Sequence, residues 1–401
     1  MFSIIDNCNN NINKFRKAVQ FNQFAIKLLQ IRMAEKWAKY ITPSKLYKTP
    51  ALPKDIVIRV TEECFLNCKF CAQGGENARI DRKNLKTGPV EISTFRKIVN
   101  ETSKWTIKPF IKITGGEPLV MGDPLLDMVQ EMRERKFIVK LNTNGMLLEN
   151  KKIARKIAET NLNYLSISID GGKEVLNEMR GHPKLFDAIM KGIDNVQGYC
   201  RELGKKNLMI LFTMMVSSDT MDQIEEVYRI ALDKNIDWFN IQFLNYTTPE
   251  SCEQAREYFS SYFKIKETPW TGFCNPRFNN IDPNLVAKQI DNILAMRRSV
   301  PISVMGNLSS SKQISKYYFS LEPIRNNICY IPFTGMHVVP PGKAAFCIDY
   351  PFYEYGDLRE ETLASIWYGK RATDFRKDMI NYYKKYKKNY PQCQRCNWRF
   401  N

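Results

Sequence analysis

Short apolar runs alternate with amphipathic stretches between residues 56 and 244. Six runs have the composition of β-strands: 56–60, 110–114, 137–143, 164–169, 208–216 and 238–244. Between them, apolar residues recur every three or four positions in stretches such as 93–104, 123–135 and 222–234, which is the spacing of one helix face. Nearly continuous apolar runs separated by helices are typical of parallel strands covered on both faces. We therefore predict an α/β fold, a partial (β/α)6 TIM-like barrel with its site at the carboxyl ends of the strands.

The N-terminal part follows a different pattern. Apolar side chains between residues 15 and 40 fall on one helical face, Lys and Arg are interspersed among them, and prolines at 43, 50 and 53 end the pattern. A basic amphipathic helix of this kind can lie on an anionic membrane, and it can equally pack on its own domain. The sequence leaves both interpretations open.

Charge is concentrated at the two ends of the 401-residue chain. Of a net charge of +18, residues 1–55 carry +7 and residues 370–401 carry +8. Basic ends suit an acidic partner such as a lipid surface or an acidic electron carrier, and they also suit plain solubilising charge. No segment reaches the roughly 18 uninterrupted apolar residues of a membrane span, and no signal peptide pattern opens the chain. We expect a cytoplasmic protein, with peripheral contact at the inner face of the membrane left open and no nucleic-acid partner.

Three of the eleven cysteines, Cys64, Cys68 and Cys71, directly follow the first predicted strand. In a reducing compartment, clustered cysteines in odd number indicate metal or redox chemistry rather than a disulfide framework. Zinc sites and iron-sulfur clusters normally take four protein ligands. Three thiolates in one loop therefore leave one coordination position open.

The spacing Cys-x3-Cys-x2-Cys, with Phe70 just before the last cysteine, resembles the motif of the radical S-adenosylmethionine (radical SAM) superfamily. The resemblance implies that Cys64, Cys68 and Cys71 hold a [4Fe-4S] cluster and that S-adenosylmethionine binds the fourth iron. It further implies reductive cleavage of that cofactor to a 5'-deoxyadenosyl radical, which removes hydrogen from a substrate C–H bond. A zinc knuckle with a distant fourth ligand is the alternative.

Further motifs end the next three predicted strands, namely TGGEPL (114–119), NTNG (142–145) and SISIDG (166–171), and MRG follows the last of them. By the same resemblance, the glycines of TGGEPL approach the methionine part of the cofactor and its acid engages the amino group. Arg180 matches the methionine carboxylate, because a guanidinium binds carboxylate bidentately. The predicted cofactor contacts are Phe70, Gly115, Gly116, Glu117, Asn142, Ser168, Asp170 and Arg180.

The C-terminal third holds a second set, Cys329, Cys347, Cys393 and Cys396. The set resembles the short SPASM extension called a twitch domain, in which four cysteines complete one auxiliary [4Fe-4S] cluster. A longer SPASM domain would need about three more cysteines between Cys347 and Cys393, so the resemblance predicts one auxiliary cluster, either redox-active or structural. A structural zinc on the same four thiolates is the alternative.

These motifs divide the chain into four predicted parts: a helical segment (1–50), a radical SAM core (51–250), a linking and substrate-covering region (251–328) and an auxiliary cluster domain (329–401). The remaining cysteines fit no spacing and are expected to be structural, although Cys274 can also touch substrate or metal: Cys8, Cys200, Cys252 and Cys274. Both histidines, His182 and His337, are expected to be structural.

The function that we predict is that of a radical SAM oxidoreductase acting on a peptide or protein. Modification of a sugar, aminocyclitol or lipid-linked substrate at a membrane surface is the alternative, and a non-catalytic metal-binding protein is a more remote one. We expect a flavodoxin or ferredoxin as electron donor. A basic run near the C-terminus is its predicted docking point: Lys384, Lys385, Lys387 and Lys388.

Overall fold

The computed structural model describes residues 50–75, 85, 87–265, 273–274, 280–296, 300–320, 328–347, 350–394 and 396. The predicted basic helix before residue 50, Cys8 and the proposed membrane contact lie outside these residues.

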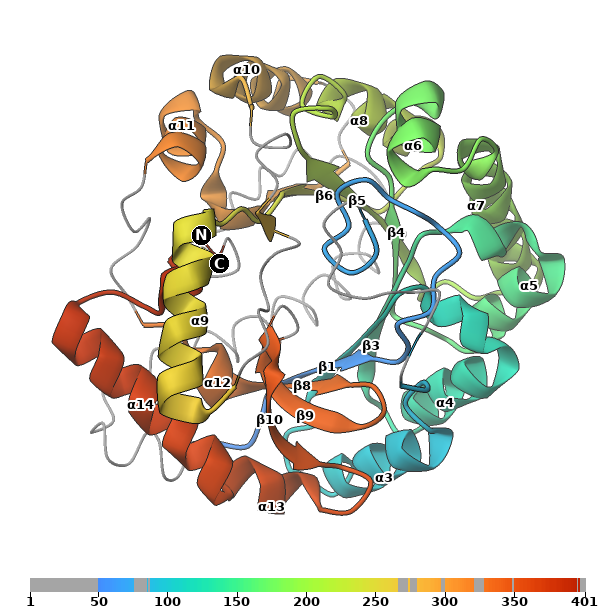
Figure 1. Ribbon diagram of the computed structural model, residues 1–401. Coiled ribbons are helices and arrows are strands. Elements are labelled where there is room, and N and C mark those ends of the chain that lie inside the picture. The colour runs from blue at the N-terminus through green and yellow to red at the C-terminus, as the bar shows by residue number, and fades with distance from the viewer. Residues whose placement is uncertain are drawn as a thin grey trace.

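Seven parallel strands follow one another across the barrel sheet: β1 (Asp55–Arg59), β2 (Phe110–Thr114), β3 (Ile138–Thr143), β4 (Tyr164–Ser168), β5 (Met209–Val216), β6 (Trp238–Phe243) and β7 (Ile302–Val304). The intervening helices are α3 (Ile92–Thr102), α4 (Gly122–Glu134), α5 (Lys151–Glu159), α6 (Lys173–Arg180), α7 (Leu185–Glu202), α8 (Ile224–Asp233), α9 (Pro249–Phe263), α10 (Pro283–Leu294) and α11 (Ser311–Phe319). Most of them lie outside the strands, which form an open ring seen end-on in Figure 1. The predicted α/β fold and its partial barrel are confirmed.

β7 is a strand that the sequence pattern did not reveal. It has three residues directly after Pro301 and pairs with β6, so the barrel sheet continues into the range that we assigned to a linking region. A three-residue strand is too short to show a periodic pattern.

The C-terminal part joins the same sheet at its other edge. β8 (Gly335–Val339) pairs in parallel with β1, placing His337 opposite Val57, and then continues into the antiparallel strands β9 (Lys343–Cys347) and β10 (Tyr350–Asp357). Among the described residues, the strand order is β10-β9-β8-β1-β2-β3-β4-β5-β6-β7, with β10 and β7 as free edges. The sheet is therefore not closed, and the strand that leads to the three-cysteine loop borders the C-terminal domain.

Helix α9 connects the barrel to this C-terminal domain on the open side of the ring, where Figure 1 shows it beside α14 (Lys370–Tyr386). The Tyr258 hydroxyl of α9 donates to both carboxylate oxygens of Asp378 on α14 at 3.0 Å, and the Tyr390 hydroxyl donates to Asp378 at 2.6 Å. The Tyr258 and Tyr382 rings meet edge to face, 5.0 Å between centroids. The shorter helices α12 (Ile331–Thr334) and α13 (Leu363–Tyr368) complete the domain. Within the described residues, no helix has the length and apolar character to span a bilayer.

Candidate active site and auxiliary cysteine cavity

The three-cysteine loop leaves β1 at its carboxyl end and is held there by the turn that follows β2. Gly116 N donates to Thr61 O and Glu117 N donates to Glu63 O, both at 2.7 Å. A Cβ atom at Gly116 would lie 2.1 Å from Glu63 O, closer than any real contact. Glycine is therefore required at this position for the two loops to pack, whatever contact it also makes with a cofactor.

The thiols of this loop are partly shielded from water: Cys68 is buried, and Cys64 and Cys71 are half-buried. The turn itself is closed by Cys71 N donating to Cys68 O at 3.1 Å. Burial raises the pKa of the Cys68 thiol to about 12; the positive charge of Arg180 opposes this shift, while Cys71 and Cys64 add to it. A cation bound between the thiols would favour their deprotonation, because metal ligation needs thiolate. The donor set fits a cluster held by three cysteines.

Glu117 is fully buried, and both of its carboxylate oxygens accept hydrogen bonds from the protein. One oxygen accepts from Leu119 N at 3.0 Å and from Thr143 Oγ1 at 2.7 Å, and the other accepts from Asn144 N at 2.7 Å. Burial raises the pKa of this carboxyl, and the three hydrogen bonds oppose the shift. Glu117 thus ties the turn after β2 to the end of β3, and a direct contact with a cofactor remains a prediction.

Asn144 is a residue of the site that the sequence reasoning missed. Its Nδ2 lies 3.9 Å from Cys64 Sγ and donates to it, whereas the predicted Asn142 is half-buried further down β3, opposite Ser166 of β4. Both asparagines belong to the NTNG motif, so the motif was the available signal. Ser168 is half-buried at the end of β4, opposite Thr213 of β5.

Asp170 and Arg180 form a buried ion pair beside the loop. The Arg180 Nε and Nη2 atoms donate to Asp170 Oδ2 at 2.7 and 2.6 Å, and Asp170 Oδ1 accepts from Met215 N at 2.9 Å. The guanidinium carbon lies 5.8 Å from the centroid of the Phe70 ring. Asp170 therefore occupies two of the Arg180 donors, and a contact with the methionine carboxylate remains a prediction.

The C-terminal end of α6 packs against the other side of the three-cysteine loop. Lys69 N donates to Met179 O at 2.9 Å. Gly181 caps the helix with a positive φ of 67°, and a Cβ atom at this position would lie 3.1 Å from Asn67 O. The MRG motif therefore lies against the cysteine loop, which brings all of the predicted motif segments to one end of the barrel.

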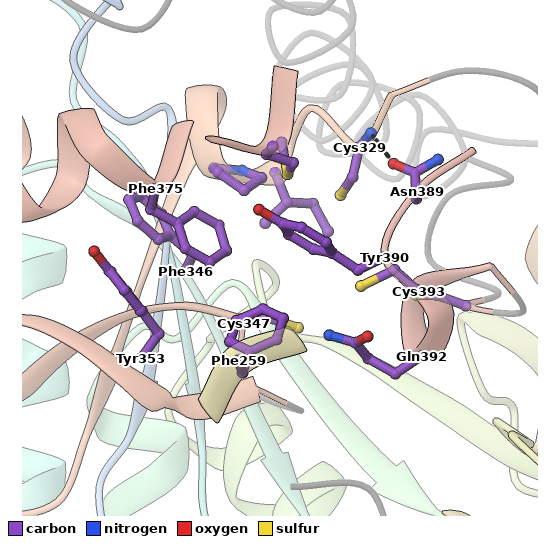
Figure 2. A pocket seen from close by; sticks show the side chains of 14 residues that line it. Phe259, Cys329, Phe346, Cys347, Tyr353, Phe375, Asn389, Tyr390, Gln392 and Cys393 are labelled. Carbon is purple, nitrogen blue, oxygen red and sulfur yellow. Dashed lines mark hydrogen bonds between the residues drawn. The ribbon is translucent and has the colours of Figure 1, made fainter. Parts of the chain in front are cut away.

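The four C-terminal cysteines line one cavity, shown in Figure 2. Cys329 precedes α12, Cys347 ends β9, Cys393 lies in the 3-10 turn Pro391–Cys393, and Cys396 follows it. Aromatic rings form much of the remaining lining: Phe259, Phe346, Tyr353, Phe375 and Tyr390. Asn389 Oδ1 accepts from Cys329 N at 3.1 Å and so holds the first cysteine in place.

Four thiols on an apolar cavity fit a four-ligand iron-sulfur cluster, since thiolate is the protein donor that such clusters take. Nowhere in the ranges given above do three or more His, Cys, Asp or Glu side chains come together closely enough to hold a single metal ion.

The residues expected to be structural lie elsewhere. His337 is buried on β8, where burial, followed by the charges of Lys112 and Arg59, lowers its pKa to about 3. Cys200 is half-buried on α7, and the Cys252 and Cys274 sulfur atoms lie 2.7 Å apart.

Two family models match the chain over these sites. The model of the radical SAM superfamily matches residues 58–231, and the SPASM iron-sulfur cluster-binding domain matches residues 329–397. The chain carries a radical SAM domain and a SPASM domain. The radical SAM core binds a [4Fe-4S] cluster and S-adenosylmethionine, and the SPASM domain binds auxiliary iron-sulfur clusters.

Among curated relatives, the tungsten-containing aldehyde ferredoxin oxidoreductase cofactor-modifying protein of Pyrococcus furiosus is 24% identical over 363 residues, which are 86% of this radical SAM chain and 88% of that relative. A probable GTP 3',8-cyclase of Methanococcus aeolicus is 32% identical over 180 residues, which are 38% of this chain and 56% of the relative. The chain thus spans little more than half of the second relative.

Among solved structures, SuiB of Streptococcus suis bound to S-adenosylmethionine shares the fold with a TM-score of 0.57 at 18% identity, over 82% of this chain and 68% of SuiB. The structure of anSMEcpe with bound AdoMet and the Cp18Cys peptide has a TM-score of 0.54 at 16% identity, over 80% of this chain and 82% of that one. The radical SAM enzyme described here therefore has the fold of both.

Proposed function

We propose that this radical SAM enzyme is an oxidoreductase that abstracts hydrogen from a C–H bond of a peptide or protein. The observation that carries the chemistry is the three-cysteine loop, which presents three thiols from one short segment at the carboxyl end of the barrel. When bound there, a reduced [4Fe-4S] cluster supplies the electron that cleaves S-adenosylmethionine into methionine and a 5'-deoxyadenosyl radical.

The residues that we assign to holding this cluster are Cys64, Cys68 and Cys71. Glu117 fixes Thr143 and Asn144 against the loop, and Asn144 donates to the Cys64 sulfur, which stabilises negative charge on it. Arg180 brings a positive charge beside Cys68, and Asp170 fixes its orientation. These contacts position the donors before any ligand arrives, and they are the protein's part in a reaction whose difficult step belongs to the cofactor.

A peptide substrate is supported by relatives of the same fold. SuiB has been solved with the precursor peptide SuiA, with a TM-score of 0.56 over 92% of this chain, and anSMEcpe has been solved with the Cp18Cys and Kp18Cys peptides bound. A second candidate is a small cofactor, because the Pyrococcus furiosus relative, matched over most of both chains, carries the name of a cofactor-modifying protein.

The reaction class is tested with S-adenosylmethionine alone. Reconstituted protein with dithionite is expected to form 5'-deoxyadenosine and methionine slowly without substrate, and the triple variant Cys64→Ala, Cys68→Ala, Cys71→Ala is expected to form neither. S-adenosylhomocysteine as the only product would indicate methyl transfer and refute the proposal.

The substrate class needs a separate experiment. Peptides encoded by short reading frames beside the gene would be made with deuterated side chains and incubated with the enzyme. Transfer of deuterium into 5'-deoxyadenosine, together with a mass change in the peptide, is the expected result. If no such peptide raises the rate of 5'-deoxyadenosine formation while a small cofactor precursor does, the second candidate is supported.

We also propose that an acidic flavodoxin or ferredoxin docks on the C-terminal end of α14. Lys384, Lys385 and Lys387 are exposed there, and Lys388 is half-buried. Changing all four to Gln should slow turnover with the protein donor several-fold at low salt and leave the dithionite-driven rate unchanged, because exposed charges steer association over about one Debye length. If wild type and this variant turn over at equal rates with the protein donor, the docking point is refuted.

A further inference from the structure

Two cysteines outside both cluster sites lie against each other. Cys252 Sγ and Cys274 Sγ are 2.7 Å apart, although the two residues are separated by 22 positions in the sequence. Uncharged heavy atoms in contact normally rest roughly 3.5–4.0 Å apart, and a covalent sulfur-sulfur bond measures about 2.05 Å. The fold therefore brings these two thiols within reach of a bond with little movement of the backbone.

The surrounding backbone holds the pair together independently of the sulfur atoms. Cys252 lies in the first turn of α9, where its N–H donates to Thr248 O at 3.0 Å. Thr247 N donates to Phe273 O at 3.1 Å, which fixes the residue before Cys274 beside the residue before the helix cap. The two cysteines are thus neighbours because two chain segments cross here.

The two thiols differ in exposure and in proton affinity. Cys252 is 5% exposed, whereas Cys274 is half-buried. The hydrogen bond between the two thiols lowers the pKa of Cys274, while that bond and burial raise the pKa of Cys252. Reactive thiols are those that are both accessible and readily deprotonated. Cys274 is the member that can attack a disulfide from solution.

The pair lies between the two cluster sites along the chain. Leu244, just after β6, packs in one apolar cluster with Phe70 of the cysteine loop. On α9, Cys252 shares its buried face with Phe259, which lines the four-cysteine cavity. A bond between Cys252 and Cys274 would therefore fasten the segment that contains Phe273 and Cys274 to α9, the helix that connects the barrel with the auxiliary domain.

We propose that Cys252 and Cys274 are a reversible dithiol that closes to an intramolecular disulfide by exchange with a low-molecular-weight disulfide. The Cys274 thiolate attacks one sulfur of the disulfide RSSR, forms a mixed disulfide and releases one thiolate. Cys252 then loses its proton to solvent and attacks Cys274 Sγ, which releases the second thiolate. In sum, two protein thiols are oxidised and RSSR is reduced to two RSH.

The proposal is tested on the anaerobic holoprotein in glutathione buffers of increasing oxidised fraction. After acid quenching, alkylation and digestion, mass spectrometry is expected to find a Cys252–Cys274 cross-link that forms at a rate independent of protein concentration and reverts with dithiothreitol. The half-buried Cys200 on α7 is the internal control, because it does not contact this pair and is expected to form no cross-link with either cysteine. Iron content is measured in parallel to show that the cluster sites remain intact.

Single variants test the assigned order of attack. Cys252→Ser should accumulate glutathione on Cys274, whereas Cys274→Ser should leave Cys252 about tenfold less modified, since a buried, high-pKa thiol is a poor nucleophile. The proposal is overturned if wild-type protein with full iron shows separately alkylated Cys252 and Cys274 in every buffer. It is also overturned if the cross-link forms only after iron is lost.

Discussion

The three-cysteine loop and the four-cysteine cavity use the same donor atoms but are assembled in different ways. In the loop, three thiols come from one short segment that backbone hydrogen bonds fix to the next strand-end turn. In the cavity, four thiols come from the segment before α12, the end of β9, and the 3-10 turn Pro391–Cys393 with the residues that follow it, and aromatic rings line the same cavity.

This difference explains how one fold can hold two kinds of cluster. A cluster held by three donors at the mouth of the barrel would keep a coordination position that a small molecule can reach, whereas a cluster held by four donors around an apolar cavity would keep none. The open site suits chemistry on a bound cofactor, and the closed site suits electron transfer or a structural role. Each prediction below changes one of the two sites, or the contacts that join them, and leaves the rest unchanged.

The largest effect is expected from a change that disturbs the packing of the three-cysteine loop. Gly116→Ala would push a methyl group against Glu63 O and displace Cys64, which should remove about half of the bound iron and lower S-adenosylmethionine cleavage by about 100-fold or more. Gly88→Ala is the matched control, because a Cβ there meets nothing within 4 Å. Equal activity of the two variants would show that the loop does not depend on this contact.

The cavity is expected to be dispensable for the uncoupled reaction. Cys393→Ala with Cys396→Ala should lose about four of about eight irons, four per cluster, and retain dithionite-driven cleavage within a few-fold. Quantitative iron analysis and 5'-deoxyadenosine assays measure the two results. If wild-type protein instead contains zinc and only about four irons, the four cysteines hold a structural zinc and not an auxiliary cluster.

The link between the barrel and the cavity depends on Asp378, which accepts hydrogen bonds from two tyrosine hydroxyls. Asp378→Ala leaves those hydroxyls unpaired and should lower the free energy of unfolding by about 2–3 kcal/mol, measured by urea denaturation. On the same helix, Asp374 pairs with the exposed Lys370. Asp374→Ala should therefore cost about 1 kcal/mol or less, and an equal cost for both variants would contradict the assigned role of Asp378.

The smallest effect concerns the β1–β8 junction that joins the two halves. The pKa of His337 is lowered to about 3 in the folded protein, against about 6.5 in an unfolded chain. The neutral side chain therefore stabilises the fold above pH 6.5, and this contribution is lost as the pH falls toward 3. Between pH 7 and 5.5, wild type should lose about 1 kcal/mol more stability than His337→Asn. Parallel pH profiles of the two proteins would show that burial of His337 costs nothing.

The features that could be predicted from the sequence are those that depend on a single short segment of the chain. All six predicted strands appear, because each carries its own apolar run, and the first cysteine site could be predicted because its three thiols share one segment. Contacts between segments that are distant in the sequence could not be predicted. The role of Asn144, the Asp170–Arg180 pair, the pairing of β8 with β1 and the approach of Cys252 to Cys274 all depend on how strands and loops meet in space.

The central claim, an open site in the loop and a closed one in the cavity, is tested most directly by electron paramagnetic resonance of the dithionite-reduced protein. Two variants separate the clusters: Cys393→Ala with Cys396→Ala keeps the loop site, and Cys64→Ala, Cys68→Ala, Cys71→Ala keeps the cavity site. Addition of S-adenosylmethionine should shift the spectrum of the first variant and leave that of the second unchanged. A shift in the second variant, or no shift in the first while its iron is bound, would contradict the account.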